Sequence, residues 1–162
     1  PRPRISAVSD SKGEFQILRH PAPMFLHAKT SNGLLAGLVK IKDDAKEAVI
    51  PIGPLAAAKG RLVDGQFDLP VPGRQIRFGF RIEMESGGWT TQFGGTVTTD
   101  ARGEFMLDGL IPGHSFEVDV VVEEGPDGRP HGWRTVATVT AAKAEVVELG
   151  DVGLRLAESK DK

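Results

Sequence analysis

The chain of 162 residues contains no cysteine and no tyrosine, and only 6% of its residues are aromatic. The absence of cysteine excludes disulfide bonds, thiolate metal sites and thiol nucleophiles together. The absence of tyrosine excludes the usual tyrosine corner of immunoglobulin-type sandwiches. A chain of this length can bury enough apolar surface to fold without cross-links, so neither absence excludes a β-sandwich.

The chain also lacks an excess of positive charge and a long apolar run. Its formal charge of −2 provides no basic surface for a polyanion, so we expect no nucleic-acid partner. No apolar run approaches the roughly 20 residues of a membrane-spanning helix, so we expect no membrane span. The first residues, Pro1-Arg2-Pro3-Arg4, have the charge of a signal-peptide start without the apolar segment behind it. We therefore expect the sequence to begin inside a longer protein.

Glycine and proline are abundant, with 20 and 11 residues, and they mark the turns of an internal repeat. The hexapeptide Asp10–Phe15 (DSKGEF) returns as Asp100–Phe105 (DARGEF), ninety positions further on (100 − 10 = 90). The strands around Phe25 and Val39 match those around Phe116 and Val136. A repeat of this kind indicates tandem β modules. We predict residues 1–54 to be the carboxyl-terminal half of a preceding module, residues 55–156 a complete module, and residues 157–162 a frayed tail.

Short alternating segments predict strands throughout the chain. They are Gly13–Leu18, Met24–Thr30, Leu35–Ile41, Ala48–Ile52, Ala57–Val63, Gln75–Met84, Gly95–Thr99, Glu104–Leu107, Phe116–Glu123, Trp133–Thr140, Glu145–Leu149 and Val152–Leu156. One apolar and one polar face per strand is typical of antiparallel sheets in a sandwich. Asp100–Gly103 predicts a hairpin turn between two of these strands.

Four motifs of the second module carry a family resemblance. They are Gly60-Arg61-Leu62-Val63-Asp64, Val71-Pro72-Gly73-Arg74, Thr98 to Phe105 (TTDARGEF) and Gly109-Leu110-Ile111-Pro112-Gly113. They resemble the carboxypeptidase regulatory-like domain, a family similar to transthyretin and to the CnaB-type modules of bacterial surface proteins. The resemblance covers nearly all of residues 57–154 and, in its second half only, residues 10–54. It implies an all-β, immunoglobulin-like or transthyretin-like Greek-key sandwich.

The resemblance implies a function without catalysis. Members of the family are mostly spacers, stalks and adaptors, so we expect a spacer or interaction module of a larger bacterial envelope or secreted protein. We expect no enzyme activity and no cofactor. The expected partners are neighbouring domains of the same protein, and the expected location is extracytoplasmic: periplasmic, cell-surface or secreted.

The sequence gives little indication of a conventional catalytic or metal site. The four histidines, His20, His27, His114 and His131, lack the short spacings of metal ligands, although His114 and His131 approach each other if their strands form a hairpin. The serines lie in turn-like stretches without the strained elbow of a hydrolase nucleophile. We predict no metal site and no catalytic residue.

The CnaB resemblance raises one covalent alternative, an isopeptide-locked adhesin-type module. Such a bond joins Lys and Asn or Asp on the outer strands with a carboxylic acid assisting, and Lys59, Asp151 and Glu117 occupy roughly those elements. Related bond-forming modules place the lysine where Leu62 stands here, and Glu117 falls on the polar face of its strand. Three ordinary surface charges are the competing interpretation.

A second alternative is a carbohydrate- or peptide-binding module. The only two tryptophans, Trp89 and Trp133, lie beside glycines near predicted loops. Aromatic side chains on loops form binding platforms because they bury area at low entropic cost. With Phe93 and His131, in the loops around Trp89 and Gly125–Gly132, they are the candidate binding residues. Trp133 also shares the parity of Val139, which favours a place in the core.

Overall fold

The computed structural model describes residues 6–18, 24–42, 44–83, 89–124 and 130–154. This part of the chain is all-β, and within it no helix is long and apolar enough to span a membrane. The strands are β1 (Met24–Lys29), β2 (Leu35–Ile41), β3 (Gly53–Pro54), β4 (Ala56–Asp64), β5 (Gln75–Glu83), β6 (Trp89–Thr98), β7 (Glu104–Leu110), β8 (Ser115–Glu124), β9 (Pro130–Thr140) and β10 (Val146–Leu154).

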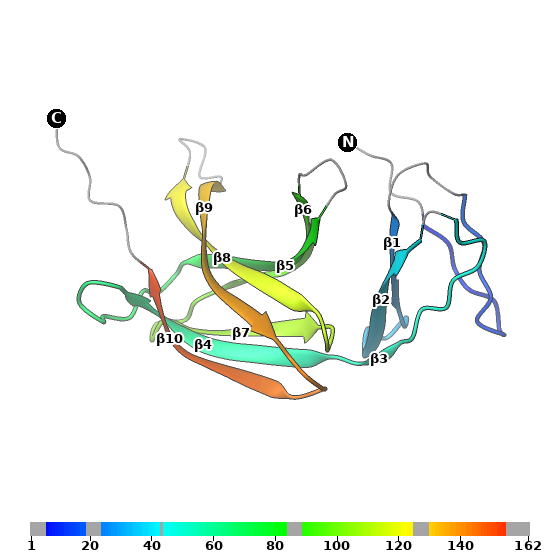
Figure 1. The fold of residues 1–162 in the computed structure, drawn as a ribbon. Coiled ribbons are helices and arrows are strands. Elements are labelled where there is room, and N and C mark those ends of the chain that lie inside the picture. The colour runs from blue at the N-terminus through cyan, green and yellow to red at the C-terminus, as the bar shows by residue number, and fades with distance from the viewer. Residues whose placement is uncertain (1–5, 19–23, 43, 84–88, 125–129, 155–162) are drawn as a thin grey trace.

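The strands form three sheets, two of which face each other as a sandwich (Figure 1). A three-stranded sheet has the order β10-β4-β7, and a four-stranded sheet has the order β6-β5-β8-β9. All described pairings in the sandwich are antiparallel except the parallel pair β10–β4. The prediction of an all-β sandwich is therefore confirmed. A third sheet, β1-β2-β3, is here called the small sheet.

The sandwich core follows the predicted alternation. Phe116 is 2% exposed, and its ring centroid lies 6.2 Å from that of Phe78 and 5.9 Å from that of Phe80. The facing sheet contributes Leu62 and Leu107, which are completely buried. Tilted and edge-on ring contacts are the favoured geometries for aromatic pairs, so this cluster adds to the burial of apolar area.

The repeated hexapeptide folds into the same turn in both places. The Oδ1 atom of Asp100 accepts hydrogen bonds from the amides of Arg102 and Glu104, both at 2.8 Å. In the first copy, Asp10 Oδ1 accepts from the amides two and four positions later, at 2.8 and 2.9 Å. The fourth residue has positive φ in each copy, +82° at Gly13 and +76° at Gly103. An aspartate that caps nearby amides and a left-handed glycine explain why these residues recur.

The prediction that Asp100–Gly103 closes a hairpin is wrong. The strands on either side, β6 and β7, belong to different sheets, so the turn carries the chain across the sandwich. The preceding residue, Thr99, is 4% exposed, and its hydroxyl donates to the Val71 carbonyl at 2.8 Å. The same hydroxyl accepts from the Arg74 amide at 2.9 Å. The family-like motifs at 71–74 and 98–105 therefore meet in space and fix this corner of the sandwich.

The other strand predictions are mostly confirmed, with three corrections. Gly13–Leu18 and Ala48–Ile52 are not strands. The segments predicted at Glu145–Leu149 and Val152–Leu156 are one strand, β10, with a bulge between Glu148 and Gly150; residues 155 onward lie outside the described part of the chain. A bulge inserts a residue and interrupts the alternation, which made one strand look like two.

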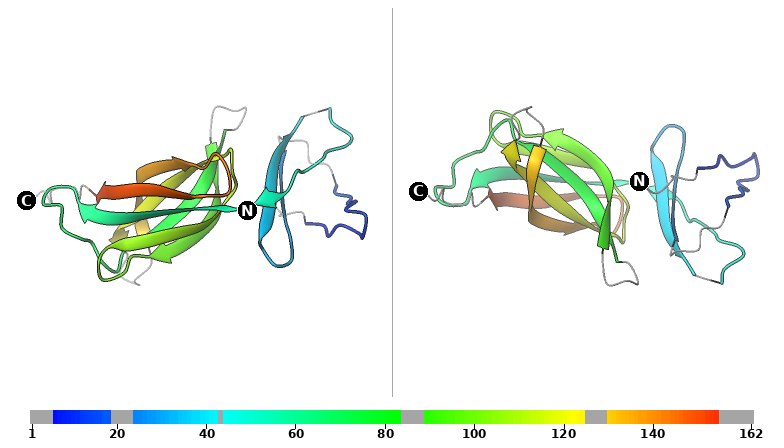
Figure 2. Two further views of the ribbon diagram at one scale, coloured as in Figure 1. Left: turned by 90° about the horizontal axis from the view of Figure 1, so that it is seen from below. Right: turned by 90° about the horizontal axis from the view of Figure 1, so that it is seen from above.

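The small sheet and the sandwich are connected through one residue, Leu55, between β3 and β4 (Figures 1 and 2). Leu55 is half-buried and packs against the hydrophobic core. Ala36 and Leu38 of the small sheet belong to the same hydrophobic cluster as the sandwich core. Residues 6–18, drawn in dark blue, lie on the side of the small sheet that faces away from the sandwich.

Candidate functional site

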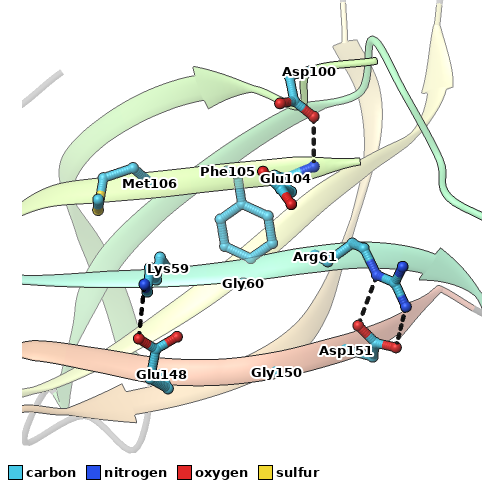
Figure 3. A pocket seen from close by; sticks show the side chains of 10 residues that line it. All are labelled: Lys59, Gly60, Arg61, Asp100, Glu104, Phe105, Met106, Glu148, Gly150 and Asp151. Carbon is cyan, nitrogen blue, oxygen red and sulfur yellow. Dashed lines mark hydrogen bonds and ion pairs between the residues drawn. The ribbon is translucent and has the colours of Figure 1, made fainter. Parts of the chain in front are cut away.

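A shallow groove of about 600 Å³ runs along the outer face of the three-stranded sheet (Figure 3). We call it the outer groove. Its charged lining residues are Lys59 and Arg61 on β4, Glu104 on β7, Glu148 and Asp151 on β10, and Asp100 in the turn before β7. Successive residues of a strand point to opposite faces, so Lys59 and Arg61 face outward while Ala58 and Leu62 enter the core.

Two ion pairs cross the outer groove from β4 to β10. Lys59 Nζ lies 2.9 Å from Glu148 Oε1. Arg61 forms a bidentate pair with Asp151, whose Oδ1 accepts from Arg61 Nε at 2.8 Å. The hydrogen bond and charge of Glu148 raise the pKa of Lys59, and the hydrogen bond from Arg61 lowers the pKa of Asp151. The groove thus carries paired charges, which suits a solvated surface more than a reactive site.

We expect the lowered pKa of Asp151 to depend on Arg61. In the Arg61→Gln variant the Asp151 carboxyl should titrate at a higher pH, whereas Lys59→Gln should leave it unchanged. The pKa of Asp151 is lower in the folded chain than in the unfolded chain. The ion pair therefore contributes its full stability at pH values above the unfolded-state pKa of Asp151. This contribution is lost as the pH falls through the folded-state pKa. NMR titration of the carboxyl carbon measures the shift. An equal response to both variants would contradict the assignment.

The floor of the outer groove requires glycine at position 60. A β-carbon there would lie 2.9 Å from the Phe105 ring and 3.1 Å from the Leu149 β-carbon. We expect Gly60→Ala to destabilise the sandwich by about 1–3 kcal/mol, because overpacking displaces a buried ring. The matched control is Gly153→Ala, where the added carbon meets only an ordinary contact at 3.7 Å. Urea unfolding of both variants makes the comparison, and equal midpoints would contradict it.

The three residues of the isopeptide hypothesis lie in two different sheets. Lys59 and Asp151 are on neighbouring strands of the three-stranded sheet, each paired with another partner. Glu117 is half-buried on β8 of the four-stranded sheet, on the face opposite Phe116. The structure therefore brings the lysine and the aspartate onto one face and leaves the glutamate on the other sheet.

A polar cluster that the sequence did not predict lies on the outer face of the four-stranded sheet. Asp119 is 6% exposed, and its Oδ2 lies 3.0 Å from Arg77 Nε. Its Oδ1 accepts a hydrogen bond from the Thr135 hydroxyl at 2.7 Å. The Arg77 guanidinium lies 4.0 Å from the centroid of a Trp133 ring. The alternating Arg77 and Asp119 were visible in the sequence, but only the strand register shows that they meet.

Trp133 is therefore not a core residue. Its parity with Val139 suggested the core, but the β8–β9 register shifts by one residue between Val118 and Asp119. This bulge puts Trp133 on the side of Arg77, while Val139 stays in the core at 2% exposed. The Arg77–Asp119 ion pair is therefore largely shielded from water, with the indole stacked on the guanidinium and the carboxylate accepting hydrogen bonds from Arg77 and Thr135.

The candidate binding residues do not converge on one loop cluster. In the antiparallel register, Trp89 pairs with Glu83 at one end of the four-stranded sheet, and Trp133 pairs with Val121 towards the other end. Phe93 lies in the middle of β6, opposite Gly79. His131 lies at the start of β9; the side chains of Trp89, Phe93 and His131 are outside the described part of the structure, as are loops 84–88 and 125–129.

The hairpin of β8 and β9 separates two histidines that the sequence allowed to approach. His114 precedes β8, whereas His131 lies near the far end of that strand, beside Glu123 and Glu124. His27 lies on β1 of the small sheet, and His20 is outside the described residues. Within the described ranges no group of three or more His, Asp or Glu side chains is arranged to hold a metal ion.

Comparisons with known proteins give weak structural similarity only. No protein-family model matches the chain, and no curated protein sequence matches it. A 9R-lipoxygenase from Cyanothece PCC8801 is 16% identical with a TM-score of 0.44, over 66% of this chain and 18% of that enzyme. The major pilin subunit BcpA of Bacillus cereus is 13% identical with a TM-score of 0.40, over 80% and 36%. The carboxyl-terminal domain of shaft pilin SpaA from Lactobacillus rhamnosus GG is 12% identical with a TM-score of 0.38, over 65% and 100%.

Proposed function

We propose that the chain is a non-catalytic structural module, a β-sandwich spacer in a tandem array within a larger extracytoplasmic protein. The observation that carries this proposal is the junction between β3 and β4. One residue, Leu55, separates them, and it packs against the core. A one-residue, half-buried connection leaves little freedom for one unit to swivel on the next.

The surfaces of the sandwich support the same function. The outer groove carries paired charges, and the polar face of the four-stranded sheet holds the Arg77–Asp119 pair under Trp133. Both arrangements connect side chains of neighbouring strands within a sheet and leave no unpaired reactive group among the residues named here. The resemblance of the four motifs to carboxypeptidase regulatory-like domains adds support, because members of that family are mostly spacers and adaptors.

A distance measurement across the junction tests the spacer function. The chain has no native cysteine, so Ser31→Cys and Gln66→Cys provide two spin-label sites without background. We expect a narrow distance distribution by double electron–electron resonance, and a much broader one after a Gly/Ser insertion behind Leu55. A broad distribution in the parent chain would contradict the proposal.

The isopeptide-locked module is a separate prediction with its own measurement. A Lys59–Asp151 amide would reduce the intact mass by one water, and Lys59→Arg would restore the full mass. An unmodified mass would show that Lys59 and Asp151 are joined to the adjacent strand by their ion pairs with Glu148 and Arg61 and not by an amide bond.

A further inference from the structure

One face of the small sheet is apolar along both long strands. Residues that pair across antiparallel strands share a face, and the register pairs Leu26 with Val39 and Ala28 with Gly37. Ile41 continues the same row by alternation. We call these five residues the open face. Leu26, Ala28, Val39 and Ile41 are only half-buried.

The opposite face of the small sheet is turned towards the sandwich. It carries His27, Lys29 and Lys40 along with Ala36 and Leu38, and the last two are buried in the hydrophobic cluster of the sandwich. The open face is therefore turned away from the sandwich. Only part of it is covered: a β-carbon at Gly37 would overlap the Pro51 carbonyl oxygen, so the segment around Pro51 lies against the sheet there.

The complete module contains the counterpart of the open face. The ninety-residue offset of the hexapeptide aligns Leu26 with Phe116 and Ala28 with Val118. These two residues pair with Val139 and Ala137 in the same pattern that joins the open-face residues of β1 and β2. This register shifts the sequence-based match of Phe25 with Phe116 by one position. In the complete module this face is core, with Phe116 and Val139 each 2% exposed.

The segment that follows the first copy of the repeated turn is also less buried than its counterpart in the complete module. Phe15 and Ile17 are half-buried, whereas their counterparts are 6% exposed at Phe105 and completely buried at Leu107. Those counterparts lie on β7, which pairs with β4 over most of its length. Residues 14–18 form no strand, although the capped turn before them is the same. Among the described residues, the first copy has no equivalent of β4, β5 or β6.

We propose that the open face and residues 14–18 together form a docking site for the amino-terminal half of a sandwich module. The occupant is a segment of β4-β5-β6 type, and its first strand pairs with residues 14–18 as β4 pairs with β7. This strand needs small or branched apolar side chains on its inner face, like Ala58 and Leu62. The inference rests on the proposed tandem organisation and adds the site and the chemical nature of the neighbour.

A fusion protein tests the docking site directly. In this fusion, residues 1–9 are replaced by a second copy of residues 55–99, and the rest of the chain is unchanged. Thr99 of the added copy then precedes Asp10, just as Thr99 precedes Asp100 in the complete module. We expect the amides of residues 14–18 to exchange hydrogen at least about tenfold more slowly than in the parent chain, since exchange then requires opening of a paired strand. The matched control carries Leu62→Asp in the added segment only and should exchange like the parent.

Residues 14–18 occur once in the fusion, so their peptide reports on this site alone. Exchange at the parent rate, with residues 104–110 still protected, would overturn the inference. Narrow spin-label distances across Leu55 together with that result would leave the spacer function intact, so the two failures are distinguishable.

A second measurement uses the chain without any fusion. An open apolar face binds the dye 8-anilinonaphthalene-1-sulfonate, and we expect Leu26→Lys with Val39→Lys to abolish most of the fluorescence increase. Met106→Lys, at a 43% exposed apolar residue on the outer face of the sandwich, is the matched control and should retain it. No increase in the parent chain, or an increase that survives the double substitution, would overturn the docking site.

Discussion

Replacement of Phe116 by alanine is expected to lower the free energy of unfolding of the sandwich by about 3–5 kcal/mol. The ring is 2% exposed and contacts Phe78 and Phe80 of β5, so its removal leaves a cavity that these neighbours cannot fill. The same change at its counterpart, Leu26→Ala, should have little effect on the sandwich. Leu26 is half-buried on the open face and has no facing sheet of its own among the described strands.

Urea unfolding followed by tryptophan fluorescence separates the two effects. Both tryptophans lie in the sandwich, Trp89 on β6 and Trp133 on β9, so the signal reports on that unit. With a urea dependence of about 1–3 kcal/mol per molar, Phe116→Ala should lower the midpoint by more than about 1 M. A similar shift in Leu26→Ala would show that the small sheet and the sandwich unfold as one core, which would contradict the predicted division into a partial and a complete module.

The sequence predicted the fold class because the sandwich obeys alternation. Gln75–Glu83 and Ser115–Glu124 follow the predicted segments within one residue, since each buries one face and exposes the other. The two segments wrongly predicted as strands, 13–18 and 48–52, carry strand-like sequence in a unit where no described strand pairs with them. Strand propensity is realised only where a neighbouring strand accepts the hydrogen bonds.

Side-chain placement was harder to predict than strands, and bulges are the physical reason. One extra residue in β9 moved Trp133 from the expected core to the outer face, beside Arg77. The Arg77–Asp119–Thr135 cluster joins β5 to the β8–β9 hairpin, and the bulge in β9 decides which residues meet, so no spacing along the chain could indicate it. The ion pairs of the outer groove depend likewise on the parallel register of β4 and β10, which alternation does not determine.

The two glycines of the repeated turn should respond very differently to the same substitution. At Gly103 a β-carbon would lie 2.6 Å from the Leu62 carbonyl oxygen and 3.1 Å from the Val71 amide nitrogen. These are backbone atoms fixed by hydrogen bonds from the Leu62 amide to the Gly103 carbonyl and from the Val71 amide to the Leu62 carbonyl. Left-handed backbone costs an alanine about 1–2 kcal/mol, and the overlap adds to it. We therefore expect Gly103→Ala to destabilise the sandwich by about 3 kcal/mol or more.

Gly13→Ala is the matched control, because its turn has the same hydrogen bonds and a φ of +82°, yet nothing lies within 4 Å of the added carbon. It should leave the tryptophan-detected urea transition unchanged. Asparagine tolerates left-handed backbone better than alanine, but Gly103→Asn keeps the overlap with the Leu62 carbonyl oxygen, so it should still destabilise the sandwich. Equal effects of alanine at both positions would show that backbone conformation alone selects these glycines. A larger effect at Gly103 would show that its turn packs against the rest of a complete module, whereas the turn at Gly13 does not.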